Sequence, residues 1–288
     1  LLVNCIPPLL VVRQAFALAM SNRPGPVLID VPKDIQQHYP RDPEGRYALP
    51  RMPAIIAPPE PPVGGINADQ LEEVCRLIRQ ASRPILYVGG GVVSSGTSDE
   101  LRKLAARLGC PVTTTLMAVG AFPPDDPLAM HVLGMHGSRY ANIAVNEADL
   151  VIAVGVRFDD RVTGKVAEFI KHGKIIHIDV DSRELNKNKQ VTLPICADLR
   201  IALRQLAECA APGRIEQWAD YCRQLKARFP QPSPGNGDGP IRPQFVIDAL
   251  SRLTGGDALV TTGVGQHQMW AMQYYRARRP RSFISSGG

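Results

Sequence analysis

The middle of this sequence alternates short, almost continuously apolar runs with helices that are apolar along one face. The apolar runs cover residues 84–91, 111–116, 150–156 and 174–180. Between the first two runs, Ser98 is expected to cap a helix that has Asp99 and Glu100 in its first turn and ends at Gly109. Strands without polar alternation are buried on both faces, so helices must cover both sides of their sheet. The pattern therefore predicts an α/β fold with a doubly wound parallel sheet.

Two proline-rich stretches, residues 39–65 and 230–240, divide the chain into three blocks. In the first block, residues 11–20 are typical of a helix and residues 26–32 of a short strand. The central block is expected to open with a helix capped by Asn67 and to close with a helix over residues 214–229. The third block begins another α/β unit, with expected helices at 245–253 and 268–275 and a strand at 258–262.

Charge and composition limit the class of partner. The net charge is +6, but basic residues are scattered beside acids, so nucleic acid is not an expected partner. The arginine cluster at residues 276–281 is more typical of a solvated rim or a subunit contact. No run approaches the roughly 18 apolar residues of a membrane span, so no membrane partner is expected. The six cysteines form no CxxC pair and are expected to be buried free thiols in a reducing compartment.

Unusual residues gather where the predicted strands end, which is where parallel sheets bind ligands. Residues 89–91 are three glycines whose backbone could approach a phosphate, although a tight turn without a ligand is the favoured alternative. His136 lies between two glycines, and it either contacts a ligand or caps a helix. Residues 157–161 (Arg-Phe-Asp-Asp-Arg) are hard to explain as core, the alternative being an exposed ion-pair cluster. Asp179 and Asp198 follow strands and are candidates for binding ribose or ribityl hydroxyls.

The third block carries a second candidate site. Its strand runs into Gly263-Val-Gly265, followed by Gln266 and His267. Glycines let backbone amides face a ligand, and the two polar side chains offer donors suited to a diphosphate. The helix expected next directs its positive end to the same place. Together these features indicate a multi-domain enzyme that binds a nucleotide or a diphosphate, without naming its reaction.

Seven strings carry a more specific signal. They are NRPGPVLIDVPKDIQ at 22–36, LYVGGG at 86–91, TLM at 115–117, LGMHG at 133–137, GVRFDDRVTG at 155–164, HIDVD at 177–181 and TGVGQHQMW at 262–270. In combination they resemble the large catalytic subunits of the acetohydroxyacid synthase (acetolactate synthase) family. The resemblance implies three parts: residues 1–57 as the end of a pyrimidine-binding domain with a linker, 58–233 as a central FAD-binding domain, and 234–288 as a linker and the start of a diphosphate-binding domain.

The resemblance also implies contacts for each cofactor and substrate. The implied FAD contacts are Arg23, Gly90, Thr115, Leu116, Leu133, Gly134, Met135, His136, Gly155, Val156, Arg157, Phe158, Asp159, Asp179, Val180, Asp198 and Leu199. Arg161 corresponds to the arginine that grips the carboxylate of the second 2-oxo acid, a task that suits its fixed fork of donors. Lys33 corresponds to the mouth of the substrate channel. Gln266 and His267 correspond to contacts with thiamine diphosphate.

The implied enzyme uses thiamine diphosphate, magnesium and FAD to decarboxylate pyruvate and condense it with pyruvate or 2-oxobutyrate in branched-chain amino-acid biosynthesis. FAD would have a largely structural role. The family's catalytic glutamate and metal-binding motif are expected to lie outside residues 1–288, so this stretch is expected to contain neither and to be inactive alone. The family also implies a homodimer or tetramer, with a small regulatory subunit as an optional partner. Its location would be cytoplasmic in bacteria, or in plastids or mitochondria in eukaryotes.

Two other interpretations stay open. A related thiamine diphosphate enzyme, such as a glyoxylate carboligase or a pyruvate oxidase, would share much of the pattern, although FDDR at 158–161 and QHQMW at 266–270 favour the synthase. A non-catalytic module that binds FAD or a nucleotide is the alternative from a different class.

Overall fold

The computed structural model describes residues 8–21, 23–33, 37, 64–209, 215–235 and 239–287. The chain divides into two compact units, Leu1–Val63 and Gly64–Gly288, and each is described by itself. The domain boundaries expected at residues 57 and 233 remain predictions.

The first unit contains helix α1 (Pro8–Met20), which confirms the helix predicted there. The strand predicted at residues 26–32 is wrong, because only Asp30 forms an isolated bridge. A strand needs neighbours that bond its backbone and cover its faces, and the described residues of this unit contain no sheet. Leu28, in the middle of the run, is accordingly 84% exposed.

The second unit is built on a six-stranded sheet in which all neighbours are parallel. Its strands are β1 (Pro84–Val88), β2 (Val112–Thr114), β3 (Ala129–Val132), β4 (Leu150–Val154), β5 (Lys174–Asp179) and β6 (Leu193–Cys196). Their order is β3-β2-β1-β4-β5-β6, so the direction of winding reverses between β1 and β4. The predicted doubly wound parallel sheet is confirmed, and its switch point lies at the carboxyl ends of these two strands.

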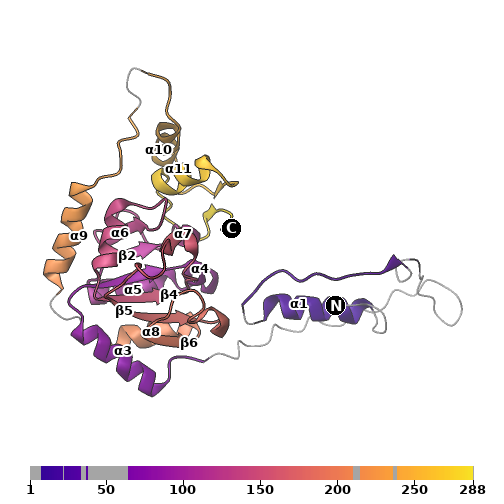
Figure 1. Cartoon of the computed structure of the whole chain (residues 1–288). Helices are drawn as coiled ribbons and strands as arrows, with labels where there is room; N and C mark the ends of the chain where they lie inside the picture. The colour runs from indigo at the N-terminus through magenta and orange to yellow at the C-terminus, as the bar shows by residue number, and fades with distance from the viewer. Residues whose placement is uncertain are drawn as a thin grey trace, which may run out of the picture. The chain divides into compact units, whose positions relative to one another are not determined.

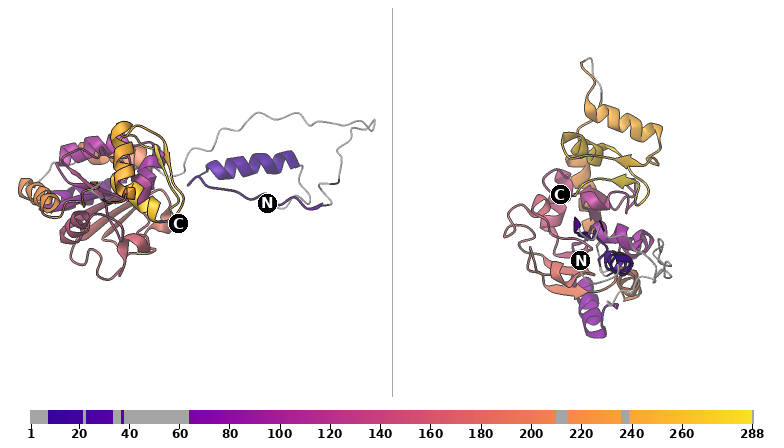
Figure 2. Two further views of the ribbon diagram at one scale, coloured as in Figure 1. Left: turned by 90° about the horizontal axis from the view of Figure 1, so that it is seen from above. Right: turned by 90° about the vertical axis from the view of Figure 1, so that its right-hand side faces the viewer.

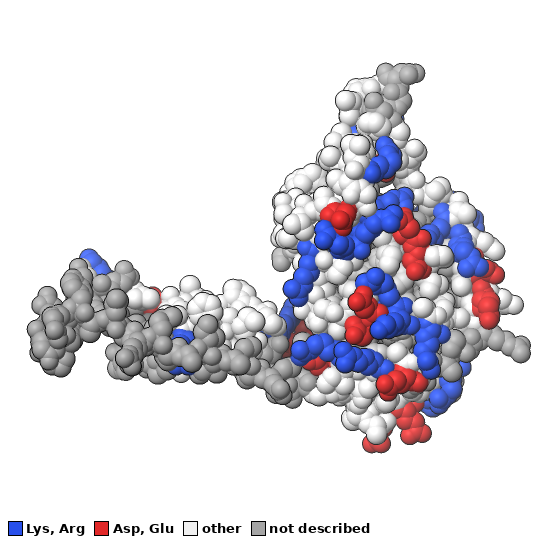
Figure 3. All heavy atoms as spheres, turned by 180° about the vertical axis from the view of Figure 1, so that it is seen from behind, with Lys and Arg blue, Asp and Glu red and all other residues white. Residues whose placement is uncertain are grey.

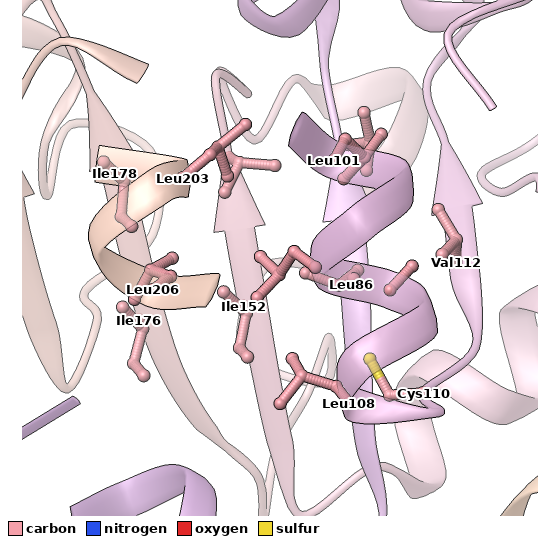
Figure 4. Close-up of a cluster of buried hydrophobic side chains, with 14 of the residues drawn as sticks. Leu86, Leu101, Leu108, Cys110, Val112, Ile152, Ile176, Ile178, Leu203 and Leu206 are labelled. Atoms are coloured by element: carbon pink, nitrogen blue, oxygen red, sulfur yellow. The ribbon is translucent and has the colours of Figure 1, made fainter. Parts of the chain in front are cut away.

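Helices cover both faces of the sheet (Figure 1). One face carries α3 (Ala68–Gln80), α4 (Gly90–Ser95), α5 (Ser98–Leu108) and α8 (Leu199–Cys209), and the other carries α6 (Arg139–Glu147) and α9 (Glu216–Arg228). Successive strand residues alternate between the two cores, so Leu86 packs in the first core and Tyr87 in the second. Figure 4 shows the first core, where leucines of α5 and α8 meet leucine, isoleucine and valine side chains of the strands.

The helix starts follow the predicted signals with one exception. The side chain of Asn67 accepts a hydrogen bond from the Gln70 amide at 2.8 Å, which confirms the expected cap of α3. Ser98 was expected to cap α5, but the cap is Thr97, whose carbonyl oxygen accepts from the Leu101 amide at 3.0 Å. Ser98 is therefore already the first helical residue, and its hydroxyl is buried without a hydrogen-bond partner among the described residues.

The edge strand β3 is missing from the sequence prediction. It is only four residues long and contains His131, so its apolar signal is weak. Tertiary contacts specify it instead: the Thr113 hydroxyl donates to the carbonyl oxygen of His131 at 2.8 Å. The Val112 amide likewise donates to the carbonyl oxygen of Leu128 at 2.9 Å.

The C-terminal part of the second unit packs beside β3 (Figure 2). It contains α10 (Pro243–Leu253), α11 (Gln266–Tyr274) and a two-stranded parallel sheet of β7 (Val260–Thr261) and β8 (Phe283–Ile284). Met272 and Phe283 join Val132 of the edge strand in a separate apolar cluster. The two predicted helices are confirmed, each starting two residues earlier than expected, whereas the strand predicted at residues 258–262 is reduced to the two residues of β7.

The arginine cluster at residues 276–281 connects this part to the sheet domain. Arg276, at 3.4 Å, and Arg278 both pair with Asp125, and Arg281 donates to the carbonyl oxygen of Ser94 at 3.1 Å. The side chains of Arg276 and Arg278 remain 57% and 58% exposed in the single chain, so the solvated rim and the subunit contact both stay predictions. Exposed ion pairs each contribute little stability, so their main effect is to orient the two parts.

The cysteine prediction is only partly right. Cys110 and Cys222 are buried free thiols, and burial raises the pKa of each to about 12. Cys196 is free but exposed, because it ends the outermost strand β6. Cys75 is disulfide-bonded, contrary to prediction, with a partner that is not among the described side chains.

Surface charge agrees with the scattered pattern of the sequence. On the face drawn in Figure 3, acidic side chains lie between the basic ones. None of the helices in the described part of the chain is long and apolar enough to cross a membrane.

Gly155→Ala is expected to lower the free energy of unfolding by more than about 3 kcal/mol. Gly155 has φ 60° and its added Cβ would lie 2.6 Å from the Cα of Gly91. Gly96→Ala is the matched control, since Gly96 has φ 72° but open space around it, and it should cost only about 1–2 kcal/mol. Urea unfolding measures both, and equal losses would contradict the close packing at Gly155.

Stability is expected to fall as the pH drops from 6.5 toward 4. Burial, with the nearby charges of Lys226 and Arg276, lowers the pKa of His131 from 6.5 to about 4. The unfolded chain therefore binds this proton first, so acidification favours unfolding within that window. Burial lowers the pKa of His177 in the same direction. His131→Gln should flatten the pH dependence of the thermal midpoint between pH 4 and 6.5; an unchanged slope would contradict the assignment.

Candidate functional site

Two glycine loops meet at the switch point of the sheet. The amide of Gly91, after β1, donates to the carbonyl oxygen of Gly155, after β4, at 3.1 Å. A Cβ at Gly89 would overlap this same carbonyl group, and one at Gly90 would lie 3.0 Å from Cβ of Met117. The two loop backbones therefore pack directly against each other, at the switch point where open parallel sheets bind their ligands.

The loop after β3, residues 133–137, is held by three different elements. The side chain of Asn142 in α6 accepts from the Gly134 amide at 2.8 Å and donates to the Gly134 carbonyl oxygen at 2.9 Å. The carbonyl oxygen of Arg161 accepts from the Met135 amide at 2.8 Å. Gln273 of α11 donates to the carbonyl oxygen of His136 at 2.8 Å. With their backbones fixed in this way, the Met135 and His136 side chains extend into solvent.

The segment 157–161 has a buried centre and an exposed rim. Phe158 is 2% exposed at φ 48°, with ring centroids 5.6 Å from Tyr87 and 5.0 Å from His177. The phenylalanine thus belongs to the core, which the sequence pattern did not suggest. The charged residues around it are exposed: Arg157 and Asp159 form a 3.7 Å ion pair.

Arg161 is the most available cation of this segment. Its side chain is 72% exposed, and among the described residues its one ion pair is a loose 4.0 Å contact with Asp160. Its backbone is well fixed, because Asp159 caps the short helix α7 (Asp160–Thr163) and accepts from the Arg161 amide at 2.9 Å. The exposed ion pairs expected as the alternative are therefore present, and they leave the guanidinium of Arg161 free to bind a carboxylate.

Two acids mark the carboxyl ends of β5 and β6. Asp179 is 8% exposed and accepts from the Asp181 amide at 2.9 Å. Asp198 is 5% exposed and accepts from the Arg200 guanidinium at 3.0 Å. The hydrogen bond from Arg200 lowers the pKa of Asp198, so this carboxylate is ionised at neutral pH and able to accept from ligand hydroxyls.

Several other predicted contacts lie along the same edge. Thr115 follows β2, and its hydroxyl is buried without a hydrogen-bond partner among the described residues. Leu116 opens the next short helix and is half-buried. Val156 and Leu199 are buried at 1% and 4% exposure, so their side chains belong to the core. The edge thus brings together predicted contacts from the ends of all six strands. These contacts are Gly90, Thr115, Leu116, the residues from Leu133 to His136, the residues from Gly155 to Asp159, Asp179, Val180, Asp198 and Leu199.

Four predicted site residues lie elsewhere. Arg23 and Lys33 belong to the first unit and are exposed, so they stay predictions. Gln266 and His267 form the exposed first turn of α11. The imidazole of His267 lies over the preceding loop, where a Cβ on Gly265 would be 3.3 Å from its Nδ1. Among the described residues, no group of three or more His, Cys, Asp or Glu side chains could hold a metal ion.

The sequence did not point to the residues that support this edge. Asn142 and Gln273 clamp the loop after β3, and Arg200 pairs with Asp198. Only Arg200 has a local signal, since it follows the acid by two residues at the start of α8. The other two act across 8 and 137 residues of chain, a separation that residue patterns do not encode.

Comparison with known proteins agrees with this geometry. A sequence-family model described as thiamine pyrophosphate enzyme, central domain, matches residues 71–206, a range that contains all six strands. Acetolactate synthase 1, chloroplastic, of Zea mays is 47% identical over 291 residues, covering 96% of this chain and 43% of the relative. Its counterpart in Oryza sativa subsp. japonica is 48% identical with the same coverage. Acetolactate synthase, chloroplastic, of Arabidopsis thaliana is 45% identical, covering 96% and 41%. The chain spans less than half the length of these curated relatives.

Asn142→Ala is expected to loosen the loop at residues 133–137. It removes one acceptor and one donor from Gly134, and a lost buried hydrogen bond costs about 1–3 kcal/mol. Amide exchange at Gly134 should therefore speed up by about tenfold or more. Lys103→Ala, on the exposed side of α5, is the control. Unchanged exchange at Gly134 would show that Asn142 does not hold the loop.

Proposed function

We propose that the chain is part of an acetolactate synthase, because residues 71–206 match the central-domain model of thiamine pyrophosphate enzymes and plant acetolactate synthases are 47–48% identical to the chain. The proposed enzyme decarboxylates pyruvate and condenses it with a second 2-oxo acid, pyruvate or 2-oxobutyrate, in branched-chain amino-acid biosynthesis. The observation that carries the proposal is the continuous edge at the switch point. There the glycine loops, the clamped loop at residues 133–137 and two acids lie on a domain nearly half identical to acetolactate synthases.

The edge suits FAD. The close backbone approach of Gly91 and Gly155 would admit a diphosphate or a flat ring. The buried hydroxyl of Thr115 has no partner among the described residues and is available to a ligand. Asp179, together with the ionised Asp198, would accept from ribose or ribityl hydroxyls. We assign FAD to this edge and expect the bound flavin to have a structural role.

Arg161 is assigned to the carboxylate of the second 2-oxo acid. Its guanidinium is exposed, loosely paired and mounted on a capped turn, so it is preorganised for a two-point contact with a carboxylate. Lys33 would serve at the entrance to the substrate channel.

Thiamine diphosphate, which supplies the electron sink for decarboxylation when bound, is assigned to the start of α11. Gln266 and His267 are exposed there beside the glycines 263 and 265, and the helix directs its positive end to the same place. Magnesium would be held by residues outside this stretch. We also propose that the enzyme is a homodimer or tetramer and that it binds a small regulatory subunit. In a eukaryote it would be located in plastids, because the similar plant enzymes are named chloroplastic.

Asp179→Asn is expected to weaken FAD binding by the purified chain about tenfold or more, through loss of a charged acceptor. The amide oxygen still accepts from the Asp181 amide, so the fold should be kept. Asp160→Asn is the matched control, because its carboxylate is 79% exposed and outside the assigned contacts. Quenching of flavin fluorescence gives both affinities. If Asp179→Asn and Asp160→Asn bind FAD with equal affinity, Asp179 does not contact the flavin. If the unmodified chain binds no flavin, the FAD assignment is wrong.

A further inference from the structure

A pocket of about 380 Å³ lies in the second unit, beside the loop at residues 133–137. Its walls are the start of α6 at residues 137–139, the segment 229–234 after α9, and the facing ends of α10 and α11. The hydroxyl of Tyr274 donates to the carbonyl oxygen of Pro232 at 3.2 Å, which fixes one wall to the other. None of the residues assigned to FAD, thiamine diphosphate or the 2-oxo acids lines it.

The lining is positively charged. It contains two arginines, Arg139 and Arg242, and no acid. The guanidinium carbon of Arg139 lies 4.2 Å from the centre of the Phe229 ring, so this side chain is held by a cation–π contact at the wall. Neither arginine forms an ion pair with any described residue, so the charge of both remains available to a ligand.

The uncharged part of the lining adds hydrogen-bond donors. Gln244 presents a side-chain amide to the pocket from the first turn of α10. That helix has no side-chain cap and no acid in its first turn, so its positive end adds to the field of Arg242 beside it. Phosphoryl groups are typically bound by guanidinium groups together with neutral hydrogen-bond donors. The pocket lining contains both, and it has no carboxylate that would compete with the ligand for the two arginines.

We propose that this pocket binds a phosphoryl group between Arg139 and Arg242, either as inorganic phosphate or as a small phosphate monoester. The volume exceeds that of phosphate alone, which leaves room for an organic part against Phe229 and Tyr274. The two arginines that would bind the phosphoryl group are not among the residues assigned to FAD, thiamine diphosphate or the 2-oxo acids, so the site can be tested separately from the proposed function.

Titration of the chain with inorganic phosphate, followed by ³¹P NMR at constant ionic strength, tests the site. One saturable site is expected. Arg139→Gln and Arg242→Gln should each weaken it about tenfold or more. Arg223→Gln, which removes an exposed arginine of α9 outside the pocket, should leave it unchanged. A parallel titration with phenyl phosphate separates the two sources, because tighter binding of the ester identifies a monoester ligand and weaker binding identifies free phosphate.

Three results would overturn the site: no saturable binding, equal displacement by chloride at the same ionic strength, or the same affinity in both arginine variants as in Arg223→Gln. Displacement of phosphate by FAD would also overturn it, since the pocket would then be part of the flavin site. The Arg139→Gln variant loses the cation–π contact with Phe229 and could fail to fold for that reason. The Arg242→Gln variant then still tests the site, because the Arg242 side chain makes no hydrogen bond to the described residues. Circular dichroism melting checks the fold of each variant.

Discussion

The contact between the backbones of the β1 and β4 loops is the constraint on which the candidate site depends. Gly91 reaches the carbonyl oxygen of Gly155 only because neither loop carries a side chain there. The neighbouring strand ends are bonded to the same pair of strands. The Thr115 amide donates to the carbonyl oxygen of Val88 at 2.8 Å, and the Gly155 amide donates to that of Ile178 at 2.9 Å. Any displacement at the centre would therefore shift the loops after β2 and β5 as well.

The loop with His136 is the second point where the fold controls the site. Asn142 fixes it from α6, Arg161 from α7 and Gln273 from α11. Helix α11 begins with Gln266 and His267 and reaches this loop near its other end. The residues assigned to thiamine diphosphate and those assigned to FAD are thus joined by one short helix, and a shift at either end would be felt at the other.

Charge is distributed so that each group keeps the state its assigned role needs. The hydrogen bond from Arg200 lowers the pKa of Asp198 and keeps this carboxylate ionised. Arg161, in contrast, forms only a 4.0 Å ion pair with Asp160 among the described residues, so its guanidinium group is available to a ligand. The rim arginines that orient the C-terminal part pair with Asp125 in solvent, where ion pairs are weak. The apolar cluster that contains Met272, Phe283 and Val132 adds burial of apolar surface to that junction.

The sequence by itself determined the layer architecture and the strand ends at which the candidate site residues lie. Uninterrupted apolar runs can only be central strands buried on both faces, and ligands of such sheets meet the strand ends, which is where the glycines and Asp179 were found. Tertiary structure decided what local pattern does not encode. It paired β3 at the edge despite His131, buried Phe158 beneath an exposed charged rim, and brought Gln273 to a loop 137 residues away. It also left residues 26–32 without a strand, because an apolar run becomes a strand only where a neighbouring strand bonds its backbone.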